Sequence, residues 1–155
     1  GPLVNPSSPQ NLMLGTFNLE IARLYNYILQ DEKSQYGIIH GLDGYDEISL
    51  TSGFKLFTKS GEQLINPEDN GLERISQSEI YGGNSVKDAA KIFKNIIEGK
   101  GTKAQNSVVL TNAAYALIII DRNLTFEEAY NTAEGSLLGG KASQCLHKLI
   151  TNCSS

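Results

Sequence analysis

The first third of the chain alternates short apolar runs with one amphipathic stretch. Apolar residues dominate positions 11–17 and 36–41, which predicts two short buried strands. Between them, apolar side chains recur at helical spacing from Ile21 to Leu29, and Asn18 stands where a helix N-cap is expected. A strand, a helix and a second strand in this order predict a βαβ unit with a right-handed crossover.

Residues 47–65 carry a different pattern, in which short apolar stretches are separated by Ser-Gly pairs. This pattern predicts a hairpin or a pair of extended segments. The polar run over 66–71 contains a proline and a glycine and predicts a loop.

Helical periodicity dominates the second half of the chain. The spacing predicts a helix over 84–101, with Ser85 and Asp88 as a variant of the capping box and Gly99 as its stop. Six residues share its apolar face, which is the face expected to be buried: Val86, Ala89, Ala90, Phe93, Ile96 and Ile97.

Three further helices are predicted towards the C-terminus. They cover 106–120, 126–138 behind a Thr125–Glu128 capping box, and 140–150. The last helix is expected to turn four side chains inward: Ala142, Cys145, Leu146 and Leu149.

These elements predict an α/β protein with part of a mixed, mostly parallel sheet flanked by helices. Three or four strands stand against five or six helices, which is few strands for a doubly wound sheet. Part of the sheet is therefore expected to be missing, so that an open edge or an uncovered apolar face remains. The residues expected near that surface are Val4, Leu12, Leu14, Ile38 and Ile39.

Composition narrows the class of protein. The 155 residues are 40% hydrophobic, which is enough for a folded core, and the net charge of −4 argues against a nucleic-acid binder. The longest apolar run, 108–120, is too short for a membrane span and contains Thr111 and Asn112. We expect no membrane association and no targeting peptide.

The two cysteines, Cys145 and Cys153, lie close together near the C-terminus. A disulfide framework would use more cysteines, spread along the chain, so both are interpreted as free thiols. Free thiols favour a reducing, cytoplasmic setting.

Candidate chemistry is concentrated in the sequence GYDEIS at 44–49. Asp46 and Glu47 are adjacent acids that repel each other, behind a glycine-rich run. Either the pair is an ordinary solvated turn or a cation sits beside it. His40 is interpreted as structural, and Asn112 is expected to satisfy a neighbouring backbone or side chain rather than a ligand.

Several stretches, in this order, resemble anthranilate phosphoribosyltransferase. They are GPLVNP at 1–6, HGLDGYDEIS at 40–49, PEDNGL at 67–72, GG at 82–83, AAKIFKNIIEGKG at 89–101, LTNAAYAL at 110–117 and GKA at 140–142. The resemblance implies a nucleoside-phosphorylase/phosphoribosyltransferase-like catalytic domain. It also implies that 1–155 is the C-terminal portion of a single α/β domain, whose N-terminal helical domain and first strands lie outside this chain.

The same resemblance implies a function for the intact protein. It would transfer a phosphoribosyl group from phosphoribosyl pyrophosphate (PRPP) to anthranilate in tryptophan biosynthesis, as a homodimer. Asp46 and Glu47 would bind Mg²⁺, and Gly1 and Pro2 would contact substrate; no residue is assigned as a general acid or base. A protease remnant is the alternative origin of Gly1-Pro2.

Two other functions stay open from the sequence. A related protein with the same α/β domain could use another acceptor, and a non-catalytic binding module could keep the fold without the chemistry. The residues that would settle the acceptor are expected in the missing N-terminal half.

Overall fold

A computed structural model describes residues 3 and 5–153. Its sheet has the order β1-β2-β3-β4, with strands β1 (Asn11–Gly15), β2 (Gln35–Gly41), β3 (Phe54–Thr58) and β4 (Gly61–Ile65). Strands β1 and β2 are parallel and are joined through helix α1 (Leu19–Leu29), which confirms the predicted βαβ unit. Asn18 caps that helix, since its side chain accepts a hydrogen bond from the Ile21 amide.

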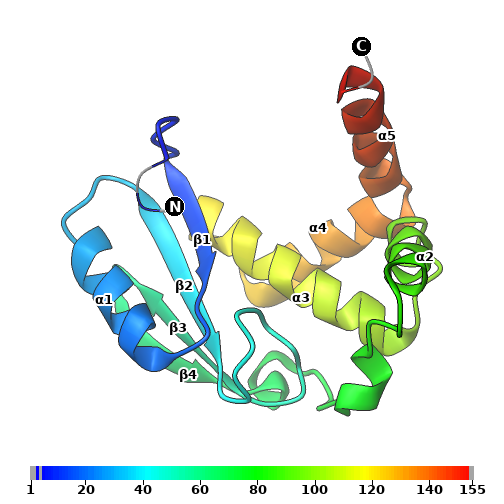
Figure 1. The fold of residues 1–155 in the computed structure, drawn as a ribbon. Helices are drawn as coiled ribbons and strands as arrows, with labels where there is room; N and C mark the ends of the chain where they lie inside the picture. Colours follow the sequence, from blue (N-terminus) through cyan, green and yellow to red (C-terminus); the bar gives the residue numbers. More distant parts are fainter. Residues whose placement is uncertain (1–2, 4, 154–155) are drawn as a thin grey trace.

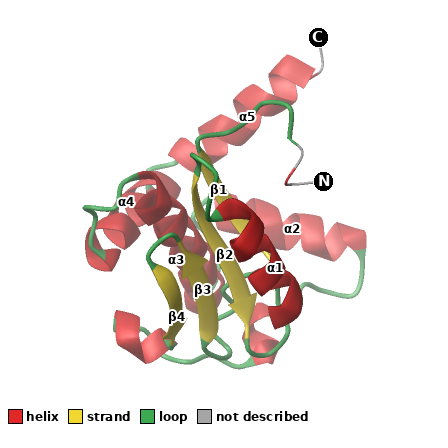
Figure 2. Cartoon of the chain, turned by 90° about the vertical axis from the view of Figure 1, so that its left-hand side faces the viewer, coloured by secondary structure: helices red, strands yellow, loops and turns green. Residues whose placement is uncertain are grey.

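One helix covers each face of the sheet. Helix α1 lies on one face and helix α3 (Lys103–Ile120) on the other, as Figure 2 shows. Successive residues of a strand point to opposite faces. Ile38 therefore packs under α1, and Ile39 packs on the α3 side with Phe54 and Tyr115.

The remaining elements extend away from the sheet (Figure 1). Helix α3 packs along α4 (Phe126–Leu138), which is followed by α5 (Lys141–Cys153). Helix α2 (Val86–Ile97) and two short 3₁₀ turns, η2 (Pro67–Asn70) and η3 (Gln77–Ile80), connect the sheet to α3. No helix of the described residues is long and apolar enough to cross a bilayer.

The sheet is mixed, as predicted, but parallel pairing is not in the majority among the described strands. Only β1–β2 is parallel, while β2–β3 and β3–β4 are antiparallel. A two-residue turn at Lys59–Ser60 reverses the chain between β3 and β4, and such short connections permit only antiparallel neighbours. The expected parallel majority is therefore corrected for this part of the sheet.

The predicted apolar face of α2 exists but is not buried. Val86 is 88% exposed and Phe93 is 50% exposed, and no residue of this helix is fully buried. In α5, Cys145 is exposed and Leu149 is 61% exposed, so the expected inward orientation of these two residues was wrong. The two faces are covered only in part, since Ile97 of α2 and Leu146 of α5 are half-buried and line one pocket between these helices.

Strand β1 is one of the two terminal strands of the described sheet, with β4 at the other edge. It pairs with β2 on one side only. Leu12 and Leu14 are half-buried there, whereas Ile38 and Ile39 are core residues, so the prediction that these isoleucines lie near the open side was wrong. Val4 lies outside the described residues.

Candidate functional site

The acidic pair lies in a loop at the carboxyl end of the parallel strands. This loop, residues 42–53, leaves the end of β2 and returns to β3, and both Asp46 and Glu47 are exposed in it. It also touches the end of β1, because a Cβ atom added at Gly15 would lie only 1.8 Å from the Asp46 carbonyl oxygen. Ligands of open α/β sheets bind at this edge of the sheet, so the position fits a binding site.

Electrostatics at the pair favour a cation. Partial desolvation raises the pKa of the Glu47 carboxyl, and the negative charge of the neighbouring Asp46 raises it further. Both effects disfavour the state with two negative charges. A bound cation would offset the repulsion and shift the Glu47 pKa back down.

A third carboxylate organises the loop rather than facing the acidic pair. Asp43 Oδ2 accepts hydrogen bonds from Ser49 Oγ at 2.9 Å and from Thr51 Oγ1. Partial burial by itself would raise the pKa of Asp43, but hydrogen bonds from Thr51, Ser49 and Ser52 outweigh it and hold that pKa below its usual range. Asp43 is therefore an ionised clasp between the two ends of the loop.

The backbone of the loop is irregular and is held from helix α3. Gly44 has a φ of 92° and Leu50 has a φ of 61°, a region sparsely populated by side chains as large as leucine. The Leu50 side chain is nonetheless fully buried in the core. Asn112 of α3 pairs with the backbone of Ile48, the residue after Glu47.

The described residues do not form a complete metal site by themselves. They contain no group of three or more His, Cys, Asp or Glu side chains placed to hold a metal. Magnesium in phosphate-processing enzymes is commonly held by one or two carboxylates together with substrate phosphates and water. Asp46 and Glu47 fit that donor set, with the remaining oxygens coming from a bound ligand.

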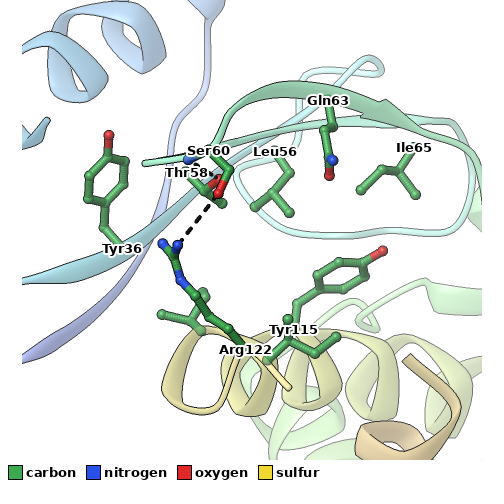
Figure 3. Close-up of a pocket in the computed structure, with 10 residues that line it drawn as sticks. Tyr36, Leu56, Thr58, Ser60, Gln63, Ile65, Tyr115 and Arg122 are labelled. Carbon is green, nitrogen blue, oxygen red and sulfur yellow. Dashed lines mark hydrogen bonds between the residues drawn. The ribbon is translucent and has the colours of Figure 1, made fainter. Parts of the chain in front are cut away.

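A groove between the sheet and α3 is separate from this loop. The cavity of about 340 Å³ is lined by Tyr36, Leu56, Thr58, Gln63 and Arg122, among others (Figure 3). Tyr36 is the second residue of β2 and Thr58 ends β3, so the groove opens at the other end of the sheet. No acidic side chain lines it, so a magnesium-dependent reaction is better served by the loop.

Comparison with known proteins decides the family. A family model described as "Glycosyl transferase family, a/b domain" matches residues 1–143. The chain belongs to this family. Anthranilate phosphoribosyltransferase from Flavobacterium johnsoniae is 48% identical over 149 residues, which are 96% of this chain and 45% of that protein. The chain thus spans less than half of the length of the curated relatives it matches.

Solved structures of anthranilate phosphoribosyltransferases share the fold. Anthranilate phosphoribosyltransferase from Thermus thermophilus superposes with a TM-score of 0.87 at 22% identity, covering 100% of this chain and 46% of that one. The Saccharomyces cerevisiae enzyme in complex with PRPP and Mg gives a TM-score of 0.83 at 21% identity, covering 94% and 42%. These neighbours confirm the α/β fold with flanking helices that the resemblance implied.

The described residues include only some of the predicted site residues. Asp46 and Glu47 stand in an irregular turn, as expected, while Gly1 and Pro2 lie outside the described residues. His40 is buried, with Nδ1 2.9 Å from the Thr16 carbonyl oxygen, so it ties β2 to the end of β1 as a structural histidine.

Sequence reasoning missed the residues that support the acidic pair. Asp43, Ser49 and Thr51 form the clasp, and Gly15 gives the loop room to approach β1. The dense run of Asp, Ser, Thr and Gly from 41 to 53 was the available signal, since such side chains commonly hydrogen-bond to their own loop.

We predict that Gly15→Ala displaces the acidic loop. The added methyl group would meet the Asp46 backbone, which cannot rotate away, so the free energy of unfolding should fall by about 1–3 kcal/mol. Urea unfolding measures the loss. Gly82→Ala is the matched control, because nothing lies within 4 Å of its new methyl group. Equal stability of the two variants would contradict the close approach.

We predict that Glu47 makes the stability of the protein depend on pH. Its pKa is raised in the folded state, so its stabilising contribution is present below its unfolded pKa of about 4.3 and is lost as pH rises through the folded value. Glu47→Gln should therefore gain stability relative to the natural protein as pH rises through this window. Asp46→Asn should lower the Glu47 pKa, measured by carboxyl ¹³C NMR titration; an unmoved pKa would contradict the coupling.

Proposed function

We propose that the intact protein carrying this chain transfers the phosphoribosyl group of PRPP to anthranilate. The products are N-(5-phosphoribosyl)anthranilate and pyrophosphate, and the pathway is tryptophan biosynthesis. The observation that carries the proposal is the exposed Asp46–Glu47 pair at the carboxyl edge of the sheet, in a chain 48% identical to a relative named for this activity.

The acidic pair is proposed to hold Mg²⁺ with the phosphates of PRPP. When bound, the ion neutralises negative charge on the pyrophosphate leaving group. The chain's own contribution is to present two carboxylates from a loop fixed by Asp43 and by the close approach at Gly15. Fixed charge of this kind stabilises a transition state without reorganising during the reaction.

The remainder of the protein is proposed to complete this domain. Residues 1–155 would be the C-terminal portion of one α/β catalytic domain, preceded by a helical domain and the first strands of the sheet. Three observations support this: the chain spans 45% of a close relative, β1 has no described strand on its outer side, and Val86 and Phe93 on the apolar face of α2 are exposed. That remainder would bring the phosphate and acceptor contacts, with Gly1 and Pro2 beside the substrate.

Assembly and location follow from the same proposal. The family resemblance implies a homodimer of intact chains, and Cys145 and Cys153, which form no disulfide, fit a reducing cytoplasmic setting. Light scattering of the purified intact protein would test the dimer.

We predict that the intact protein consumes fluorescent anthranilate only with both PRPP and Mg²⁺. Asp46→Asn with Glu47→Gln should abolish most turnover, because the leaving group loses its metal partner. Asp31→Asn with Glu127→Gln removes the same charge from exposed acids elsewhere and should leave turnover unchanged. The isolated 155 residues should show no turnover and no micromolar Mg²⁺ binding.

Different outcomes would point to the other functions. Magnesium-dependent consumption of PRPP with an acceptor other than anthranilate would identify a related transferase. Ligand binding without any turnover would identify a non-catalytic module.

We predict that the isolated chain self-associates, or binds its N-terminal remainder when that is supplied separately. An open strand edge and a partly exposed apolar helix face both favour association. Sedimentation velocity over a concentration series measures it, and Val86→Lys with Phe93→Lys should weaken it. A strictly monomeric chain that ignores the remainder would contradict the truncated domain.

A further inference from the structure

The backbone next to Glu47 is held by a residue from a distant helix. We propose that Asn112 is a positioning residue, whose carboxamide fixes the conformation in which the loop presents Asp46 and Glu47 to a metal. The inference rests on the proposed function, because it concerns the same acidic pair. It adds that metal binding by the two acids depends on the side-chain amide of Asn112, which neither family membership nor the acids themselves imply.

The contact joins two segments 64 residues apart in sequence. The Ile48 amide donates to Asn112 Oδ1 at 3.1 Å, and Asn112 Nδ2 donates to the Ile48 carbonyl oxygen at 2.8 Å. A side-chain amide thus takes the place of a neighbouring strand, exchanging two hydrogen bonds with one residue. The second Nδ2 proton goes to the Val108 carbonyl oxygen at 2.9 Å, within α3 itself.

These three bonds define which way the carboxamide faces. Both protons of Nδ2 are directed at carbonyl oxygens, and Oδ1 receives an amide proton. A carboxylate of nearly the same shape would set an oxygen against two carbonyl oxygens. An aliphatic side chain would leave the polar groups of a buried backbone without partners. Asparagine therefore suits the position through both its donor and its acceptor.

Ile48 needs such a partner because the sheet does not reach it. Strand β2 ends at Gly41 and β3 begins at Phe54, so residue 48 lies outside the strand pairing while its side chain is fully buried. Buried backbone groups nearly always find a hydrogen-bond partner. Those of Ile48 find it in Asn112.

The consequence for Glu47 follows from peptide geometry. The Ile48 amide lies in the same peptide plane as the Glu47 carbonyl group. Fixing that amide therefore restricts rotation about the Cα–C bond of Glu47. The Asp43 clasp on Ser49 and Thr51 fixes the next residues of the loop. Helix α3 packs on both the sheet and α4, so Asn112 is itself on a rigid support.

The test compares variants of the intact protein in Mg²⁺ titrations of the transferase rate. Asn112→Asp and Asn112→Ala should raise the Mg²⁺ concentration for half-maximal rate by about 10–100-fold, the usual effect of removing a residue that supports a metal ligand. Asn131→Asp is the matched control, since it makes the same change at an exposed position of α4. Leu110→Ala is the stability control, because it loosens the α3–α4 core without touching the loop.

A second readout needs no turnover. Hydrogen–deuterium exchange of a peptide spanning residues 47–50 should accelerate in both Asn112 variants and stay slow in Asn131→Asp. Leu110→Ala should lower overall stability yet keep the natural Mg²⁺ dependence. If Asn112 only stabilised the fold, its variants would behave in the same way as Leu110→Ala.

The outcomes separate the positioning role of Asn112 from the metal role of the acids. The positioning role would be overturned if the Asn112 variants kept the natural Mg²⁺ dependence, or if they changed it no more than Leu110→Ala does. The proposed function would still be upheld by a loss of activity in Asp46→Asn with Glu47→Gln. If the double acid variant itself kept the natural Mg²⁺ dependence, the metal role of the acids and the positioning role would both be wrong.

Discussion

Helix α3 is the constraint on which the rest of this structure depends. It packs on the sheet along one side and on α4 along another, so it joins the α/β half to the helical half. From Val108 to Ile120 the helix is mostly apolar, and most of these residues are buried or half-buried against its neighbours. Tyr115 stands at the junction, with its ring 5.2 Å from Phe54 of β3 and 5.6 Å from Phe126 of α4.

The acidic loop inherits its shape from that packing. Asn112 reaches it from α3, Gly15 admits it to the end of β1, and Asp43 closes it on itself. The loop also contains an unusual leucine, Leu50, whose positive φ persists because its side chain is locked in the core. Two adjacent acids are therefore held by the interior of the domain although they themselves face solvent.

Two surfaces of the described residues, on α2 and on β1, are left partly exposed. On helix α2 the apolar residues Val86 and Phe93 are exposed, and strand β1 has no described strand on its outer side. A chain that spans less than half the length of its relatives is consistent with such surfaces. The position of the acidic pair at the carboxyl edge of the sheet leaves it open to ligands.

The sequence by itself determined the local features of this protein. Three kinds of feature were predictable because each depends on residues a few positions apart. They are the βαβ unit, the turn that carries the acids, and the helix caps at Asn18, Ser85 and Thr125. The family could also be recognised from ordered short motifs.

Only the tertiary structure decided what each face and loop meets. Periodicity marked α2 as amphipathic, but it cannot say whether a neighbour covers that face, and here Val86 and Phe93 stay exposed. Likewise nothing in the local sequence links Asn112 to Ile48 or Gly15 to Asp46. Such contacts form when distant segments of the chain meet around a shared core. The hydrophobic pattern indicates which residues are buried, but not which distant residue each one contacts.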